Sequence, residues 1–173
     1  MTLTHAAPAF DVAIPATSLD GEVIGLPGRL TLPDSAIGLV LFAHGSGSSR
    51  LSPRNTFVAS VLHEAWIGTL LFDLLTEQEA TDRANVFDIR LLADRLLAAL
   101  QFVAGHEPTR HLPLGLFGAS TGAAAALVAA AEEPAARDGP QAGEEQAGWP
   151  DVLAEAGAGA GPRGEQAPER AAA

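Results

Sequence analysis

The protein has 173 residues, enough for one domain with a sizeable core, and it is acidic, with a formal net charge of −11 and neither cysteine nor lysine. An acidic chain lacks the basic surface that binds phosphates, and a chain without cysteine has no thiolate metal sites, so we expect neither nucleic-acid binding nor a metal or other cofactor. The sequence has no apolar run as long as a membrane span and no secretion signal at its start, which predicts a cytoplasmic protein that does not bind membranes.

The first part of the chain predicts three strands. Residues 10–15 and 26–33 are apolar stretches separated by Asp20 and Gly21, a typical turn dipeptide, and they predict an antiparallel hairpin. The next apolar run, residues 38–43, reads GLVLFA. Such a continuous run is typical of a parallel strand that is buried on both faces.

A loop of small residues with the sequence HGSGSS follows this third strand. Small side chains let main-chain N–H groups approach a substrate oxygen, so we expect Gly45 and Gly47 to line a substrate site and residues 45–47 to supply an oxyanion-hole donor. His44 is expected to shape the loop and not to act as a base. A phosphate-binding loop is the alternative, but a dinucleotide fingerprint needs a glycine where Arg50 stands, and a P-loop needs a lysine.

The middle of the chain predicts a helix, a strand and a second helix. Ser52 followed by Pro53 is typical of a helix start, and apolar residues then recur at helical spacing as far as about Trp66. Residues 67–75 predict a buried strand. A long amphipathic helix that is stopped by Gly105 is indicated by the spacing of seven apolar residues, Val86, Ile89, Ala93, Leu96, Leu97, Leu100 and Val103.

Asp73 is placed near the carboxyl end of the predicted strand that begins at residue 67, which is the edge where parallel sheets form their active sites. We therefore include it as a candidate substrate-binding residue, although a helix cap or a loop hydrogen bond is the commoner use of such an aspartate. Arg50, Arg54 and Arg83 are candidates for binding a substrate carboxylate as bidentate donors. Solvated surface arginines are the more frequent case.

The most informative stretch is the junction between a predicted strand, residues 112–118, and an alanine-rich helix, with the sequence GASTG between them. A sharp turn there would expose Ser120 Oγ and place the N–H of Thr121 beside developing negative charge. Gly118 and Gly122 would allow a close approach of strand and helix. We predict a nucleophile at Ser120 and an oxyanion donor at Thr121, against the alternative of an ordinary turn that holds a serine.

The blocks LVLFAHGSGSSRLSPRN, IGTLLFDLL and LPLGLFGASTGAAAALVAA together resemble the α/β-hydrolase superfamily, in particular the dienelactone hydrolase-like proteins. The resemblance covers residues 10–133 and implies a mostly parallel sheet with helices on both faces, a Ser–His–Asp triad and small ester or lactone substrates. Ser120 matches the family's nucleophile, and Ser46 with Thr121 match its oxyanion loop. Some members are described as hydrolase domains linked to phosphoribosyltransferases.

The resemblance ends after Glu133, and we place the hydrolase domain at residues 1–133. Residues 134–173 are rich in Ala, Gly, Glu and Pro and contain only three larger apolar side chains, those of Trp149, Val152 and Leu153. Such a segment buries too little apolar surface to offset the entropy of ordering it, so we predict a disordered tail.

The triad is expected to be incomplete. All five histidines precede Ser120, whereas the family's catalytic histidine follows it, and neither Asp138 nor Asp151 ends a credible strand. We therefore expect an incomplete α/β-hydrolase fold that lacks its C-terminal strands, its triad acid and its histidine. Composition bias in the tail is also what a shifted reading frame in GC-rich DNA would give.

The sequence leaves two classes of function open. The first is a serine hydrolase for small esters or lactones, truncated or frameshifted and poorly active as this chain. The second is a non-catalytic remnant, or a binding or assembly module. Because the last predicted strand would have an open apolar edge, we also expect self-association through that edge.

Overall fold

The computed structural model describes residues 7–132 of the chain. The order expected from the sequence, a hairpin followed by alternating strands and helices, is confirmed. Within the described residues the elements are β1 (Ala9–Thr17), β2 (Val23–Thr31), β3 (Gly38–Ala43), α1 (Pro53–Glu64), β4 (Ile67–Phe72), the 3-10 helix η1 (Glu79–Thr81), α2 (Arg83–Phe87), α3 (Ile89–Gly105), β5 (Leu114–Gly118) and α4 (Thr121–Glu132).

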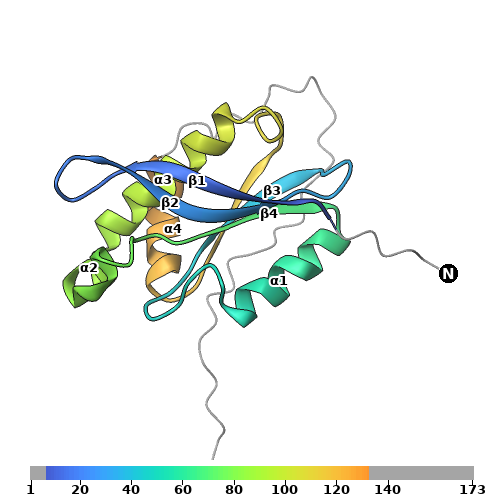
Figure 1. Cartoon of the computed structure of the whole chain (residues 1–173). Coiled ribbons are helices and arrows are strands. Elements are labelled where there is room, and N and C mark those ends of the chain that lie inside the picture. The colour runs from blue at the N-terminus through green and yellow to red at the C-terminus, as the bar shows by residue number, and fades with distance from the viewer. Residues whose placement is uncertain (1–6, 133–173) are drawn as a thin grey trace, which may run out of the picture.

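The strands form one mixed sheet in the order β1-β2-β4-β3-β5. The pairs β1–β2 and β2–β4 are antiparallel, and β4, β3 and β5 run parallel to one another. Figure 1 shows α1 on one face of this sheet, with α3 and α4 on the other. The α/β fold with helices on both faces is therefore confirmed, and its parallel part consists of the three strands whose carboxyl ends carry the candidate site residues.

Two hydrophobic clusters fill the layers on either side of the sheet. The larger one joins the sheet to α3 and α4, and the smaller one lies under α1. Strand β3 contributes to both, because successive side chains of a strand point to opposite faces, and it is buried at all six positions. Members of the clusters from β3 are Leu39, Leu41 and Ala43 in the larger one, and Val40 and Phe42 in the smaller one.

The hairpin turn and the start of α1 follow their sequence signals. Gly21 has a φ of 84° in the hairpin loop, a conformation that favours glycine. The Ser52 hydroxyl accepts a hydrogen bond from the N–H of Asn55 at the start of α1, whose first residue is Pro53. The helix ends at Glu64 and not at Trp66, because Trp66 has a left-handed φ of 61° that no helix can include.

The predicted strand that begins at residue 67 and the predicted long helix also have different bounds in the structure. Strand β4 ends at Phe72 and not at residue 75, because the N–H of Leu74 donates to the side chain of His44 instead of to a strand. The predicted long helix is broken before Ile89, so that Val86 lies in the separate helix α2. Asp88 causes the break, since its carboxylate accepts from the N–H of Leu91 and caps α3.

Strand β5 differs from the prediction in its burial and its start. The sequence predicted a buried strand over residues 112–118, but β5 begins at Leu114 and all five of its residues are only half-buried. The cause is its place in the sheet, because within residues 7–132 it is an edge strand.

No helix in the described part of the chain is long and apolar enough to cross a membrane. The predicted disordered tail, residues 134–173, lies outside the described residues, as do His5, Asp138 and Asp151.

Candidate active site

Ser120 lies in the turn that joins β5 to α4, in a strained backbone conformation. Its φ is 54°, in the left-handed region that costs a residue with a Cβ roughly 1–2 kcal/mol. Its side chain is exposed. A strained, exposed serine between a strand and a helix is the geometry of the nucleophile elbow of α/β enzymes.

Two glycines allow β5 and α4 to meet at this turn. A Cβ on Gly118 would lie 2.5 Å from the Cα of Ala123. A Cβ on Gly122 would lie 2.1 Å from the carbonyl oxygen of Ala43 and 2.5 Å from that of His44. No side chain fits at such distances, so the close approach expected at both glycines is confirmed.

The loop after β3 packs directly against the turn that carries Ser120. A Cβ on Gly45 would lie 2.9 Å from the carbonyl oxygen of Ala119 and 3.1 Å from Ser120 Cβ. The loop itself turns tightly, because the N–H of Ser48 donates to Gly45 O at 3.2 Å and Gly47 has a φ of 71°. Glycine with positive φ at the third position is typical of a type II turn, which has Ser46 at its second position.

Two main-chain N–H groups, one in the glycine loop and one at the start of α4, are free. Within residues 7–132, the N–H of Ser46 and the N–H of Thr121 donate to no acceptor. Thr121 is the first residue of α4, and the first N–H groups of a helix have no intrahelical acceptor. The sequence assigned these two groups to an oxyanion hole, and that role stays a prediction. Thr121 follows Ser120 directly in the chain, and Ser46 follows Gly45, which packs against Ser120.

His44 is held by the main chain on both of its ring nitrogens. Nε2 accepts from the N–H of Leu74 at 3.1 Å, so the proton of the neutral ring is on Nδ1, which lies 3.1 Å from Gly45 O. Neither nitrogen is left to take a proton from Ser120, and the expectation that His44 shapes the loop is confirmed. Among the described residues no hydrogen bond joins Ser120 to His106, His111 or His63, and the last of these bonds to Thr69.

Asp73 and Arg50 form a partly buried pair next to the same loop. One carboxylate oxygen of Asp73 accepts from the main-chain N–H of Arg50 at 2.7 Å, and the other accepts from its guanidinium. The side chains are 15% and 31% exposed, so the expectation that Arg50 is a solvated surface arginine is wrong. Substrate binding by Asp73 stays a prediction, but both oxygens of its carboxylate already accept hydrogen bonds from Arg50 of the loop. Of the other two arginines, Arg54 is exposed and Arg83 stacks on Phe87.

Comparison with known proteins shows which solved structures and curated proteins the chain is similar to. No family model matches the chain. The chain is 49% identical to a dienelactone hydrolase from Anabaena variabilis, with a TM-score of 0.64, over 73% of this chain and 59% of that crystal structure. The chain is therefore similar to a dienelactone hydrolase and has part of the α/β-hydrolase fold.

Two further comparisons place this hydrolase-like chain among its relatives. An esterase of Pyrococcus furiosus is 22% identical with a TM-score of 0.56, over 74% of this chain and 48% of the other, and this likeness shows the fold alone. Proteins named "Putative phosphoribosyl transferase" from two strains of Mycobacterium tuberculosis are 53% identical over 132 residues, which is 73% of this chain. The chain spans only 30% of the length of these curated relatives.

The structure brings the predicted site residues of this hydrolase-like chain to one edge of the sheet. Ser120 follows β5, the glycine loop follows β3 and Asp73 follows β4. What the sequence missed is the tie between Arg50 and Asp73, which are 23 residues apart and carry no local signal of their contact. No group of His, Asp and Glu that could hold a metal ion occurs in the part of the chain that the structure describes.

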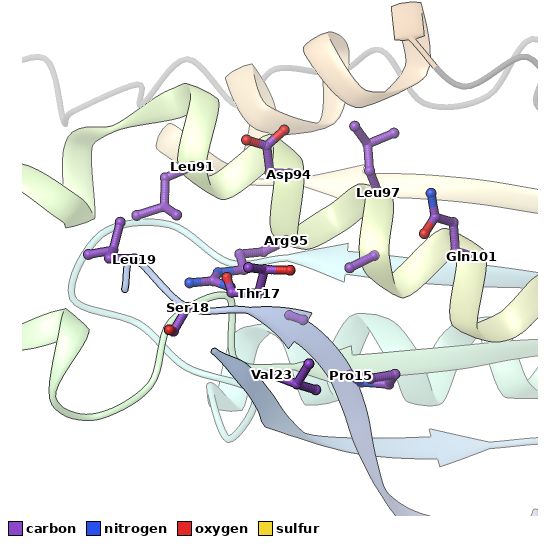
Figure 2. A pocket seen from close by; sticks show the side chains of 12 residues that line it. Pro15, Thr17, Ser18, Leu19, Val23, Leu91, Asp94, Arg95, Leu97 and Gln101 are labelled. Atoms are coloured by element: carbon purple, nitrogen blue, oxygen red, sulfur yellow. The ribbon is translucent and has the colours of Figure 1, made fainter. Parts of the chain in front are cut away.

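A cavity of about 690 Å³ lies elsewhere, between the hairpin and α3, and Figure 2 shows its lining. It contains none of the residues around Ser120. Arg95 is buried against it, donating to the carbonyl oxygen of Thr17 and, at 2.5 Å, to a carboxylate oxygen of Glu79. Its Nε has no partner among the described residues. Glu79 neutralises Arg95, and Asp94, the other charged residue of the lining, is paired with Arg90. The pair of Glu79 and Arg95 serves to hold α3, η1 and the end of β1 together.

Proposed function

We propose that this chain carries the nucleophile and the oxyanion hole of a serine hydrolase that acts on small esters or lactones. The observation that carries the proposal is the left-handed φ of 54° at Ser120, at a junction against which Gly45 packs so closely that a side chain there would strike Ser120. Ser35 and Trp66 also have left-handed φ values, so the angle alone does not indicate function. What distinguishes Ser120 is that it is an exposed serine at a strand-to-helix junction against which a glycine loop packs.

The residues support the first steps of acyl transfer. Ser120 Oγ attacks the carbonyl carbon of the ester and loses its proton to a base, while the carbonyl oxygen becomes an oxyanion that accepts from the N–H groups of Ser46 and Thr121. Collapse of this tetrahedral intermediate expels the alcohol and leaves an acyl group on Ser120, which water then hydrolyses. In a lactone the expelled alcohol stays attached to the acyl group.

The base is not among the described residues, and this sets the expected activity. His44 is bound to the main chain through both nitrogens, and no other described histidine bonds to Ser120. Loss of the base lowers turnover by roughly 10⁶-fold in subtilisin, which leaves about 10³ to 10⁴ over water from binding and the oxyanion hole. We therefore expect the chain by itself to turn over esters very slowly, and a complete site to need a histidine from beyond residues 7–132 or from another chain.

Substrate class is proposed from the relatives. The dienelactone hydrolase of Anabaena variabilis is similar at 49% identity, which supports a lactone or small ester. We do not propose phosphoribosyl transfer for this segment, because it is 30% of the proteins that have that name. Dinucleotide binding by the glycine loop is not proposed either. Arg50, which is held by Asp73, stands where a dinucleotide-binding loop needs glycine.

The experiment that tests the proposal labels the nucleophile directly. The full chain is treated with a fluorophosphonate, which esterifies an activated serine and releases fluoride, and the adduct is located by peptide mass spectrometry. Added imidazole stands in for the missing base, so we expect labelling at Ser120 that imidazole accelerates and that Ser120→Ala abolishes. A chain that is a non-catalytic remnant or a binding module would show no serine labelling with or without imidazole, and this result would overturn the proposal.

A matched pair of variants tests the oxyanion donor at Ser46. Ser46→Pro removes the N–H, and proline is favoured at the second position of a type II turn, so the loop should keep its shape. Ser46→Ala keeps the N–H. Removing one oxyanion donor costs about 10² to 10³ in rate, so we expect Ser46→Pro to slow labelling by that factor while Ser46→Ala leaves it unchanged. Equal rates for the two variants would remove Ser46 from the oxyanion hole.

A further inference from the structure

We infer that Asp73 is a positioning residue, which holds the proposed oxyanion loop in place through Arg50. This inference rests on the proposed function, because the loop in question is the one that presents the Ser46 N–H beside Ser120. It replaces direct substrate binding by Asp73 with an action through the loop.

The loop is tied to the rest of the molecule by two consecutive residues of the chain. Asp73 binds the end of the loop at Arg50, through the main-chain N–H at 2.7 Å and through the guanidinium. Leu74 binds the beginning of the loop, since its N–H donates to His44 Nε2 at 3.1 Å. Within the described residues these are all the hydrogen bonds from residues 44–50 to segments other than the adjoining helix start.

The residues that hold the loop are themselves fixed. The N–H of Asp73 donates to Pro27 O in β2 at 3.0 Å, which continues the pairing of β2 with β4. Leu74 is fully buried in the larger hydrophobic cluster. A loop tied at both ends to such a support keeps the turn at Gly45 to Ser48 against the serine, even though the tip residues Ser46 and Gly47 are exposed.

An aspartate is required for this arrangement because two different donors must be satisfied at once. An ionised carboxylate accepts both the main-chain N–H and the guanidinium, and charge-assisted bonds of this kind are stronger than neutral ones. An asparagine in its place would keep one carbonyl oxygen for one of the donors, but it would turn an N–H₂ group toward the other. By contrast, the pair of Arg90 and Asp94 on α3 is half exposed, touches no loop of the site and provides a matched control.

The test measures loop order and adduct formation separately in the full chain. Asp73→Asn is compared with wild type and with Asp94→Asn. Amide hydrogen exchange of residues 45–50 reports how firmly the loop is held, with the amides of β3 as an internal reference for the fold. Phenylboronic acid reports the oxyanion hole, because its boron accepts Ser120 Oγ as the hydroxyl proton leaves to solvent, and the resulting tetrahedral anion is seen by boron NMR without any need for a catalytic base.

We expect Asp73→Asn to speed exchange of residues 45–50 and to raise the dissociation constant of the boronate by about ten- to a hundredfold, the effect of misplacing a reacting group by about an ångström. Asp94→Asn should change neither quantity. If Asp73→Asn does not fold, Arg50→Gln carries the same test, since it removes the guanidinium and keeps the main-chain N–H for Asp73. It should then show a smaller effect in the same direction.

The outcomes separate this inference from the proposed function. If wild type forms the Ser120 adduct and Asp73→Asn forms it equally well with unchanged exchange, the inference is overturned and the hydrolase proposal stands. If wild type forms no adduct while Asp73→Asn loosens the loop, the hydrolase proposal fails and the holding of the loop by Asp73 is supported as a structural feature alone. If wild type forms no adduct and exchange is unchanged as well, both are overturned.

Discussion

Ser120 holds a backbone conformation that lowers the stability of the fold. A φ of 54° brings Cβ close to the main chain in any residue except glycine. Where such strain persists at an exposed serine beside a close-packed glycine loop, function is the reason we propose for it. The backbone strain at this position can be measured with two substitutions.

We predict that Ser120→Gly makes the chain more stable than Ser120→Ala. Glycine adopts φ values near 54° without strain, whereas alanine keeps the Cβ that causes it, so the free energies of unfolding should differ by about 1 kcal/mol in favour of glycine. Both variants lack Oγ and neither should be labelled by a fluorophosphonate. Denaturant unfolding of the three proteins measures the difference, and an alanine variant as stable as the glycine one would mean that the turn stores no strain.

His63 gives the fold a dependence on pH. Its Nε2 lies 2.8 Å from the hydroxyl oxygen of Thr69, which is fully buried on β4, and burial lowers the pKa of His63 below its ordinary value of 6.5. The unfolded chain therefore binds the proton more readily than the folded one. As the pH falls below 6.5, proton uptake favours the unfolded state, and the free energy of unfolding decreases until the folded pKa is passed.

The measurement for His63 is the free energy of unfolding between neutral and mildly acidic pH. His63→Gln keeps a hydrogen-bonding side chain but does not titrate, so its stability should fall less than that of wild type over this range. His111, which is exposed, is the control, and His111→Gln should leave the wild-type slope unchanged. Parallel slopes for wild type and His63→Gln would assign the acid sensitivity to other groups.

At the scale of elements, the junction of β5 and α4 depends on contacts between main chains. Gly122 approaches the carbonyl oxygens at the end of β3, and Gly118 approaches the first turn of α4. This contact is what aligns the helix start with the end of two neighbouring strands. Because main-chain atoms cannot move aside as a flexible side chain can, these positions tolerate no side chain.

We predict that Gly122→Ala destabilises the chain by about 3 kcal/mol or more, the upper range for overpacking, since its Cβ would lie 2.1 Å from Ala43 O. Gly105→Ala is the matched control. Nothing lies within 4 Å of a Cβ at Gly105, and alanine is the better helix former by about 1 kcal/mol, so this variant should be as stable as wild type or slightly more so. Thermal melts followed by circular dichroism compare the two, and a small loss at Gly122 would contradict the packing.

The same junction shows which features the sequence determines locally. Ser52 and Pro53 at the start of α1, and the glycines around Ser120, act within a few residues of one another, so pattern alone predicted the helix start and the strand-to-helix turn. Asp88 also acts locally, but an aspartate inside an amphipathic pattern looks like any polar position, and the break between α2 and α3 was missed for that reason. The partners Arg50 and Asp73 meet only after β3 and β4 have paired, which no local pattern records.

At the scale of the whole molecule, β5 has one edge that pairs with no strand among the described residues. It pairs with β3 on one side and is the edge of the sheet within residues 7–132. The N–H of Leu39 donates to Pro113 O, and the N–H of Ala119 donates to Ala43 O, so the odd-numbered residues of this stretch face β3. Since peptide groups alternate sides along a strand, the N–H groups of Leu114 and Leu116 point outward.

We propose that this open edge associates with a second copy of the chain, as unpaired strand edges do. The strand contains its own control, because the amides of Gly115 and Phe117 face β3 and should be protected from hydrogen exchange at every protein concentration. The amides of Leu114 and Leu116 should exchange quickly in dilute solution and become protected as the concentration rises. Sedimentation velocity over the same concentrations should show the sedimentation coefficient increasing in step.

The two readouts together separate the sheet edge from other surfaces. Association with fast exchange at Leu114 and Leu116 would assign the contact to another patch, such as the α4 side chain of Leu127, which is 73% exposed. A monomer at all concentrations would mean that the edge is not used between copies. The unpaired edge of β5 would then be the place where a further parallel strand joins the sheet. Such a strand could end in a segment that brings a histidine to Ser120, because the carboxyl ends of parallel strands meet at the same edge of a sheet.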